Sequence, residues 1–296
     1  MKRIHIPFLV DIVSSDDPVE IEAFAQDPKL DRAYADHSIL TNGKIIQRVR
    51  DTLQIDGNPF PTVAPKDAPG RAAAQDALWS RLSALAPVYS AGPDELETLA
   101  AFVRGESPED TCGLLVQQVV GRLFVPGFTA TEASWNAAVL LDRAPRTMDP
   151  AVLAVWALTK QVDQAKQTLS DMVGGDLAAV HAIGIALHNI VSGVNLMREL
   201  YSDASTRAGM SPEIAGSRCI FAPATIIRQP TAPDTLHTCE LETGTLVLMN
   251  LQAANEKSPK SDIAFLRKTW SQCPAEQWVP ALLEGIWTRA CATPAN

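Results

Sequence analysis

The sequence predicts a mainly α-helical protein, one domain over residues 1–296, with a small β region in its C-terminal third. Three observations support this. A helix-start motif recurs, in which a polar residue precedes a proline and an acid often follows. Residues 151–203 hold almost no helix breaker. Residues 220–252 are rich in Thr, Val, Ile and Leu and are interrupted by prolines, which is typical of short strands.

The start motif predicts four helices, because the polar side chain can accept N–H groups of the first turn and proline has the required φ. These helices begin after Asp17, Ser107, Asp149 and Ser211. The second should reach Phe124, and a weaker start lies near residue 92. Residues 71–85 have helical spacing of their leucines and predict a further helix.

Residues 151–203 predict two helices, one ending near Ser170 and a long, mostly buried one from Met172 to Tyr201. Within residues 220–252 we expect short strands, including a hairpin near residues 235–249. The last helix should follow Cys273. Pro280 would cost ~3 kcal/mol inside it, so this helix must kink or start late.

Composition limits the class of function. The net charge of −9 argues against a nucleic-acid or anionic-membrane surface. Five widely spaced cysteines favour a reducing compartment, and we expect a cytoplasmic protein. The apolar residues 4–10 are too short for a signal peptide and lack a cleavage site. Residues 177–197 carry His and Asn side chains, which suit a buried helix better than lipid.

Cys273 is the most informative single residue. Pro274 and Glu276 follow it and are typical of a helix start, where free N–H groups favour a thiolate over a thiol. A thiolate held in that way can bind a metal or haem iron, or act as a nucleophile. The alternative is a buried cysteine that acts as a small apolar residue.

The segments between residues 172 and 287 follow one another in an order that resembles the cytochrome P450 family. These segments are Gly174-Gly175-Asp176, Glu213 with Arg218, the strand 222–228 that ends in Arg228, residues 244–255 with their Gly-Thr-x-Val and Ala-Ala-Asn parts, Phe265, and Cys273. The resemblance implies a P450-like helical fold. It also implies haem (iron protoporphyrin IX) as cofactor, with Cys273 as the axial ligand of its iron.

The resemblance implies further cofactor-binding residues. Phe265 belongs to the haem-binding loop, and Arg228 should bind a propionate, since arginine supplies a permanently charged fork. The alternative for Arg228 is a solvent-exposed strand end. A second propionate partner should come from an N-terminal helix, with Arg81 and Arg71 as candidates. The alternative for each of these is a solvated helix face.

The distal side of the haem is implied by residues 174–181. Gly174 and Gly175 resemble the kink of the oxygen-binding helix, where the macrocycle approaches the backbone. The alternative is a helix junction. Asp176 would relay protons, and His181 would act as a distal acid or base, because its ordinary pKa suits proton transfer near neutrality. The alternative for His181 is a hydrogen-bonded core residue.

The sequence also departs from the family pattern. Residues 266–270 replace the glycines of the haem loop, and the interval from Phe265 to Cys273 is one residue longer than usual. Glu213 and Arg218 are five residues apart instead of three, so they would not share a helical face. The hydroxyl that normally follows Asp176 is absent, because Leu177 and Ala178 stand there.

The resemblance implies an oxidoreductase, a monooxygenase or peroxygenase that acts on a small organic substrate in a specialised biosynthetic pathway. A redox partner protein or peroxide would supply oxidising equivalents. One alternative is a haem enzyme that performs a dehydration or rearrangement. Another is a catalytically silent P450-like binding or scaffold protein. A third is an unrelated helical enzyme with Cys273 as nucleophile.

Overall fold

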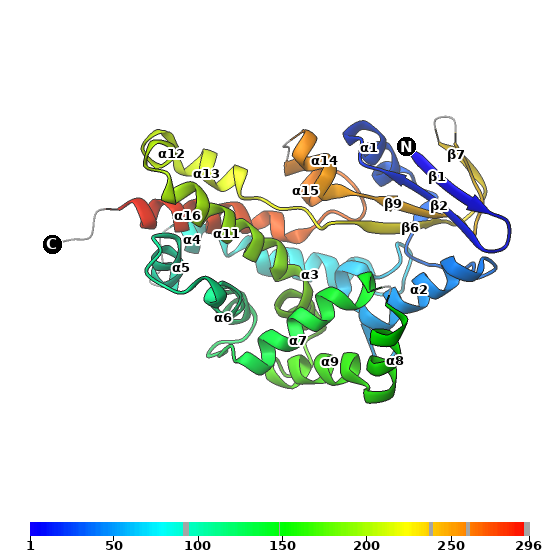
Figure 1. Ribbon diagram of the computed structural model, residues 1–296, viewed down its shortest axis with the longest axis horizontal. Helices are drawn as coiled ribbons and strands as arrows, with labels where there is room; N and C mark the ends of the chain where they lie inside the picture. Colours follow the sequence, from blue (N-terminus) through cyan, green and yellow to red (C-terminus); the bar gives the residue numbers. More distant parts are fainter. Residues whose placement is uncertain (91–94, 148, 237–238, 259–260, 293–296) are drawn as a thin grey trace. The chain divides into compact units, whose positions relative to one another are not determined.

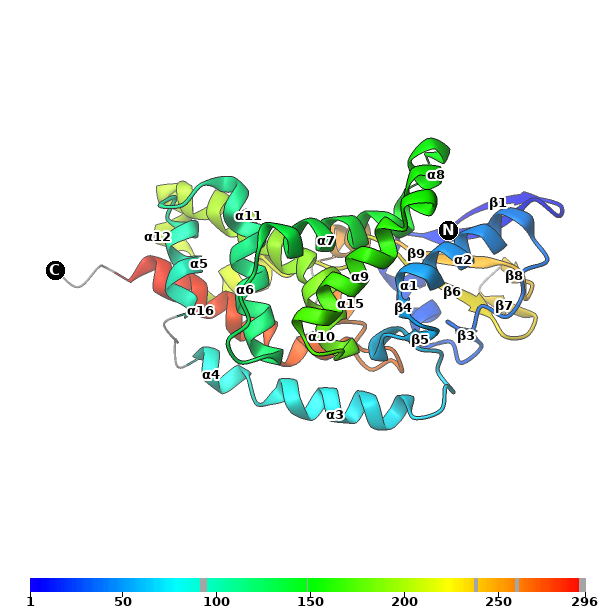
Figure 2. The same ribbon diagram turned by 90° about the horizontal axis from the view of Figure 1, so that it is seen from below.

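The computed structural model describes residues 1–90, 95–147, 149–236, 239–258 and 261–292. The chain forms two compact units that are interleaved in the sequence (Figures 1 and 2). The first unit comprises Met1–Asp76 and Ala222–Cys273, and the second comprises Ala77–Phe221 and Pro274–Asn296. The expectation of a single domain over residues 1–296 stays a prediction.

A five-stranded sheet is the centre of the first unit, in the order β1-β2-β9-β6-β3. Its strands are β1 (Lys2–Ile6), β2 (Val10–Ser15), β3 (Leu30–Asp31), β6 (Ile226–Pro230) and β9 (Leu246–Met249). β2 and β9 run parallel, and the other neighbours are antiparallel. The β region of the C-terminal third is therefore confirmed. The N-terminal strands complete the same sheet, which the sequence analysis did not predict.

Helices and two small hairpins complete the first unit. The helices are α1 (Pro18–Gln26), α2 (Leu40–Thr52), α14 (Leu251–Lys257) and α15 (Ser261–Phe265). The hairpins are β4 (Gln54–Ile55) with β5 (Asn58–Pro59), and β7 (Asp234–Leu236) with β8 (Cys239–Leu241). The hairpin expected at residues 235–249 is shorter than predicted, since β9 joins the central sheet. Its residues 237–238 lie outside the described part.

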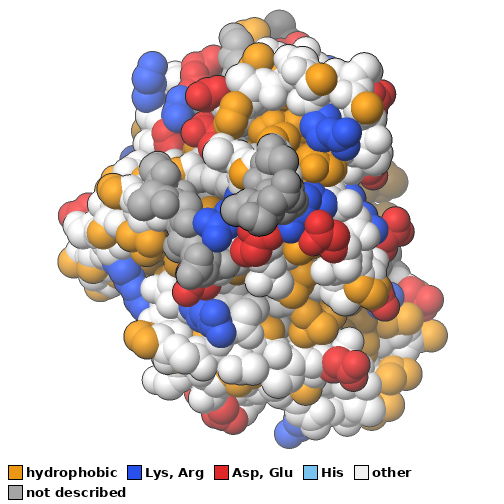
Figure 3. Space-filling view, turned by 90° about the vertical axis from the view of Figure 1, so that its left-hand side faces the viewer, with side chains coloured by type: hydrophobic (Ala, Val, Ile, Leu, Met, Phe, Trp, Pro, Cys, Tyr) orange, Lys and Arg blue, Asp and Glu red, His pale blue; other side chains and the backbone are white. Residues whose placement is uncertain are grey.

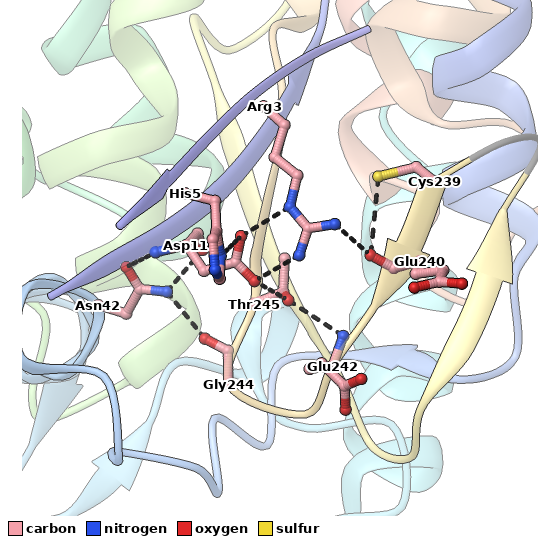
Figure 4. A network of polar contacts seen from close by, with 9 residues as sticks. All are labelled: Arg3, His5, Asp11, Asn42, Cys239, Glu240, Glu242, Gly244 and Thr245. Atoms are coloured by element: carbon pink, nitrogen blue, oxygen red, sulfur yellow. Dashed lines mark hydrogen bonds and ion pairs between the residues drawn. The ribbon is translucent and has the colours of Figure 1, made fainter. Parts of the chain in front are cut away.

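One carboxylate joins several elements of the first unit (Figure 4). Asp11 is 2% exposed, and Arg3 donates to both of its oxygens at 2.9 and 3.0 Å. Thr245 Oγ1 donates to Oδ2 at 2.5 Å, and Asn42 donates to the Asp11 carbonyl. Burial raises the pKa of Asp11, but the hydrogen bonds from Arg3, Thr245 and His5 outweigh burial and leave it below its ordinary value. The charges of Arg3 and Asp11 are thus balanced within the protein.

The second unit is helical. Its helices are α3 (Arg71–Ser83, whose first turns belong to the first unit), α4 (Ala86–Ser90), α5 (Glu95–Val103), α6 (Cys112–Phe124), α7 (Glu132–Arg143), α8 (Pro150–Thr159), α9 (Gln161–Met172), α10 (Leu177–His181), α11 (Leu187–Ser202), α12 (Ala204–Gly209), α13 (Pro212–Arg218) and α16 (Val279–Cys291). α16 packs against α5 and α13. The side chain of Trp287 in α16 is 1% exposed and lies in the core of this unit. The predicted mainly α fold is confirmed.

The helix starts predicted after Asp17, Asp149 and Ser211 are confirmed, and the weaker start near residue 92 lies outside the described residues. The side chains of Asp17, Asp149 and Ser211 each accept backbone N–H groups of the following turn. After Ser107 a short 3-10 turn precedes α6. Pro280 lies in the first turn of α16, because that helix begins only at Val279. The prediction that this helix starts late is therefore correct.

The two helices predicted over residues 151–201 have different bounds in the structure, and those predictions are wrong. Lys160 has φ 52° and separates α8 from α9. α9 continues to Met172, and Gly174 and Gly175, with φ 64° and 82°, end it. The long apolar helix therefore starts only at Leu177, with Asp176 as its N-cap. Local apolar content predicted helix here, but the left-handed residues interrupt it.

The long helix is irregular at Ala182–Ala186, which form a π-helical segment between α10 and α11. Gly184 lies there because an added Cβ would come within 2.8 Å of Leu169 Cδ1. The buried side chain of Gln117 donates to the Ile183 carbonyl at 2.9 Å. The carbonyl that the π segment releases is thus satisfied from α6.

The helix Leu177–Ser202 is long and apolar enough to cross a membrane by length and composition. It also packs against α5 and α6, as the core helix of a globular unit does. On the face shown in Figure 3, Lys and Arg side chains are interspersed with Asp and Glu.

Candidate functional site

Cys273 ends a loop that is closed by a backbone hydrogen bond. Its N–H donates to the Phe265 carbonyl at 2.8 Å, so residues 266–272 are held between α15 and the cysteine. Phe265 is 5% exposed and anchors the start of the loop, and Cys273 is half-buried. Phe265 and Cys273 thus bound one loop, and their roles toward haem stay predictions. A 3-10 turn, Pro274–Gln277, follows the cysteine.

The loop has left-handed residues where glycines would be expected. Leu266 has φ 50° and Lys268 has φ 61°. This conformation costs an L-residue roughly 1–2 kcal/mol, because Cβ comes close to the following carbonyl. The loop therefore keeps a glycine-type backbone without glycine, and such strain persists where the surrounding structure fixes the shape of a site.

Cys273 differs from two of the other cysteines in its surroundings. All five cysteines are free thiols. Burial raises the pKa of Cys112 and of Cys219 to about 12, so both stay protonated and unreactive. Cys239 is half-buried and Cys291 is exposed on the last turn of α16. Among the described residues no group of three His, Cys, Asp or Glu could hold a metal ion by itself.

Three arginines surround the side chain of Trp270, three residues before Cys273. The guanidinium carbons of Arg32, Arg71 and Arg228 lie 5.1, 4.9 and 5.1 Å from the centre of the indole ring. We call these four residues the arginine cluster. They come from the segment after β3, from the start of α3, from β6 and from the loop before Cys273, all within the first unit.

The cluster is held by neutral acceptors. Arg228 donates to Ser271 Oγ at 2.9 Å and to the Ile227 carbonyl at 2.8 Å. Arg71 Nη2 donates to the Trp270 carbonyl at 2.9 Å, and Arg32 Nη1 donates to the Thr62 carbonyl at 2.6 Å. Within the described part of the chain, no carboxylate forms an ion pair with any of these three arginines. Arg71 Nε is buried and has no hydrogen-bond partner there.

Burial makes these positive charges costly. Arg228 is 2% exposed and Arg71 is 8% exposed. Burial lowers the pKa of Arg228 to about 10, and it also lowers the pKa of Arg71 and, strongly, that of Arg32. The buried carboxylate of Asp31 offsets part of this lowering at all three arginines, and the carboxylate of Asp67 does so at Arg71. Asp31 Oδ1 accepts the backbone N–H groups of Arg32 and Lys66. The cluster therefore carries more positive than negative charge, which a protein interior tolerates poorly without an anion.

Two sequence-based alternatives are wrong here, and two residues of the cluster were missed. Arg228 is not a solvent-exposed strand end, and Arg71 is not on a solvated helix face. Arg32 and Trp270 were not predicted as site residues. Nothing in the sequence around Arg32 indicates its place in the cluster, because that place depends on β6 and on the loop before Cys273, which lie about 200 residues or more later.

Arg81, which was predicted to bind the cofactor, belongs to the second unit. Its Nη1 donates to Asp176 Oδ2 at 2.8 Å, and its Nη2 donates to the Phe124 carbonyl at 2.5 Å. Asp176 Oδ1 accepts the N–H groups of Ala178 and Ala179 and so caps α10. The structure thus brings Arg81 and Asp176 together, as an ion pair at a helix start. Arg81 is not part of the arginine cluster.

Gly174 and Gly175 lie in the turn before α10, not inside a helix. Their positive φ values explain why glycine stands there, since an added Cβ would meet no atom within 4 Å. His181 is the last residue of α10 and is half-buried. His188, seven residues later, packs against Trp135 and contacts the Ala138 carbonyl, and burial lowers its pKa.

The expected Glu-x-x-Arg pair is not formed. Glu213 lies in the first turn of α13 and Arg218 in the last, and no ion pair joins them in the part of the chain that the structure describes. The hydrogen bond from Ser211 lowers the pKa of Glu213 instead. This agrees with their spacing of five residues, which puts them on different faces of the helix.

No protein-family model matches the sequence, and no curated protein matches it. Solved structures do match in fold. A six-coordinated cytochrome P450 from Thermus thermophilus has a TM-score of 0.65 at 17% identity, with 98% of this chain and 85% of that chain covered. CYP175A1 of Thermus thermophilus has a TM-score of 0.61 at 14% identity and 98% and 83% coverage.

A mutant of P450 EryK in complex with erythromycin B also has a TM-score of 0.61, at 12% identity, with 97% of this chain and 84% of that chain covered. At these identities the comparison establishes the fold and leaves the activity open. The chain therefore has the cytochrome P450 fold, and haem is the cofactor that this fold implies.

Proposed function

We propose that the chain is a haem-thiolate protein, with Cys273 as the iron ligand and the arginine cluster as the binding site for the haem propionates. The observation that carries this proposal is the set of three guanidinium groups, with Arg71 and Arg228 buried, that lack a carboxylate partner. Haem has two carboxylates, and they would neutralise the excess charge. The buried Arg71 Nε is an unused donor for one of them.

The chemistry of the donors fits the cofactor. A charge-assisted hydrogen bond from an arginine to a carboxylate is worth roughly 1.5–3 kcal/mol. Arg71 and Arg228 are anchored by the Trp270 carbonyl and Ser271, which are close to Cys273 in the sequence. The residues that would hold the propionates and the residue that would hold the iron are thus connected through one short loop.

A haem-thiolate centre supplies the electron density that favours O–O cleavage. We infer an oxidoreductase that acts on a small organic molecule, with a redox partner protein or peroxide as the source of oxidising equivalents. Among proteins of similar fold, one is described in complex with a fatty acid ligated to acyl carrier protein and one with myristic acid. Substrates of that kind are compatible with this proposal but are not specified by it.

His181 is our proposed acid or base for proton transfer. Asp176 has one oxygen bonded to two backbone N–H groups and the other paired with Arg81, so it acts as a helix cap. Ala178 cannot donate a proton. If His181 is the acid or base, His181→Ala should lower turnover per bound haem by about 10²-fold, the usual scale for this loss. A core histidine would instead change only thermal stability.

A second candidate function is a haem-free protein that uses the P450 fold for binding. The specific observation in its favour is the indole of Trp270, which lies within 5.1 Å of all three guanidinium carbons and already provides cation–π contacts. If the indole takes the place of the propionates, the wild-type chain should bind no haem even when haem is supplied.

The deciding experiment is the visible spectrum of the full chain, purified with haem available and then reduced with CO. A haem-thiolate protein gives the Soret band of a thiolate-bound iron, and Cys273→Ala abolishes it while the far-UV circular dichroism stays helical. Cys239→Ala and Cys291→Ala are matched controls and should keep the band. A colourless wild-type protein, or an unchanged band in Cys273→Ala, would contradict the assignment.

A further inference from the structure

Helix α8 has a composition that does not fit its surroundings. Of its ten residues, Pro150–Thr159, only Thr159 is polar, and the Thr159 hydroxyl donates to the Val155 carbonyl of the same helix. None of the ten residues is buried, and Leu158 is 85% exposed. A helix that is apolar on all sides is normally enclosed by protein or lipid. α8 therefore has a surface that needs a covering partner.

Four of the exposed side chains of α8 form one stripe, which Pro150, Ala157 and Thr159 flank. Ala151, Ala154, Val155 and Leu158 are all exposed, and their spacing of three, four and seven residues puts them on one helical face. Val152, Leu153 and Trp156 are half-buried on the other side. Figure 2 shows α8 projecting away from α7 and α9, its neighbours in the chain.

The ends of this stripe carry opposite charges. Asp149 caps the N-terminus of α8, and its Oδ1 accepts the N–H groups of Ala151 and Val152. Lys160 follows the C-terminus and is exposed. An apolar stripe with an acid at one end and a base at the other is complementary to a copy of itself that runs in the opposite direction.

We propose that α8 is the contact between two copies of this chain, with the two helices packed antiparallel about a two-fold axis. In that register Asp149 of one copy faces Lys160 of the other. Ala151 then faces Leu158, and Ala154 faces Val155, so that each large side chain meets a small one. This small-to-large pairing at both ends is what an isologous interface requires.

Lipid is a poorer occupant of the same surface. Ten helical residues span about 15 Å, half of the hydrocarbon thickness of a bilayer. Helices that lie in the membrane interface have a polar, usually basic face, and α8 has none. The proposal does not depend on haem binding.

The interface formed by α8 alone is small. Stable interfaces bury roughly 1,200–2,000 Å² in total, and two ten-residue helices bury less than that. The dimer should therefore dissociate on dilution. Sedimentation equilibrium of the full chain over micromolar to millimolar concentrations should show a reversible monomer–dimer equilibrium.

Variants test the register. Leu158→Glu places a charge opposite Ala151 at both ends of the interface and should raise the dissociation constant by about 100-fold or more. Ile214→Glu is the matched control, because Ile214 is a 51% exposed apolar residue of α13, and it should leave the equilibrium unchanged. Lys160→Glu should weaken the dimer by roughly tenfold through repulsion from Asp149.

A cross-link provides a positive test that does not rely on loss of association. Ala154→Cys, in a chain that also carries Cys239→Ser and Cys291→Ser, should form a disulfide-linked dimer on mild oxidation, since Ala154 lies next to the axis. Ala157→Cys, on the same helix but off the stripe, should not. Three outcomes would overturn the proposal: a monomer at all concentrations, a dimer that Leu158→Glu leaves intact, or a monomer that binds phosphatidylglycerol vesicles through α8.

Discussion

Two arginine sites of the first unit handle buried charge in opposite ways. Arg3 donates to both oxygens of Asp11, which is 2% exposed, so positive and negative charge are balanced inside the protein. Arg71 and Arg228 are buried, whereas Arg3 is exposed; the two buried arginines donate to carbonyl and hydroxyl groups, and no carboxylate forms an ion pair with them in the described part of the chain. The difference teaches that a buried carboxylate with a charged partner serves the fold, whereas the unbalanced charge of the arginine cluster fits the haem propionates that we propose for it.

The largest expected effect concerns the balanced site. Asp11→Ala removes the acceptor of Arg3 and Thr245 and should lower the free energy of unfolding by about 3 kcal/mol, measured by urea denaturation. Haem binding per folded molecule should not change. A loss of haem affinity without a loss of stability would show that the two sites do not differ as proposed.

The next effect concerns the unbalanced site. Arg228→Gln should weaken haem binding by roughly 1.5–3 kcal/mol, about 10- to 150-fold, because one charged donor to a propionate is lost. The ligand-free protein should not be destabilised to the same extent, since a costly buried charge is also removed. Arg228→Lys should recover part of the affinity, because the charge survives and the fork does not. Competitive transfer of haem to apomyoglobin measures the haem affinity of the wild type, of Arg228→Gln and of Arg228→Lys.

The pH dependence of protein stability further distinguishes the Arg3–Asp11 pair from the arginine cluster. The pKa of folded Asp11 lies below its ordinary value, so its ion pair adds stability above the unfolded pKa of ~3.9. That stability is lost as the pH falls through the lower, folded value. Unfolding midpoints between pH 6 and pH 3 should therefore fall more steeply in the wild type than in Asp11→Asn. Parallel profiles of the two proteins would show that Asp11 does not contribute to the pH dependence of stability.

The smallest effect concerns the loop between the arginine cluster and Cys273. Lys268 is exposed and has φ 61°, so Lys268→Gly should relieve backbone strain and raise stability by up to about 1 kcal/mol. Lys268→Ala keeps the strain and is the control. Thermal unfolding of the three proteins checks this, and a glycine variant no more stable than the alanine variant would show that the loop is not strained.

The sequence by itself determined the features that depend on neighbouring residues. Asp17, Asp149 and Ser211 cap their helices because a cap and its N–H partners are two or three residues apart. The predicted loop from Phe265 to Cys273 is likewise a local structure, although its glycines are replaced. The mainly helical class follows from the same local patterns.

Only the tertiary structure decided which charges are buried and where the long helix begins. Arg32 and Arg228 meet at Trp270 because β3 pairs with β6, about 200 residues away in the sequence. The N-terminal strands β1 and β2 join the sheet through β9 in the same way. Left-handed Gly174 and Gly175 interrupt an apolar run that local spacing predicts as helix. Burial and strand pairing depend on distant segments, and a local pattern carries no information about them.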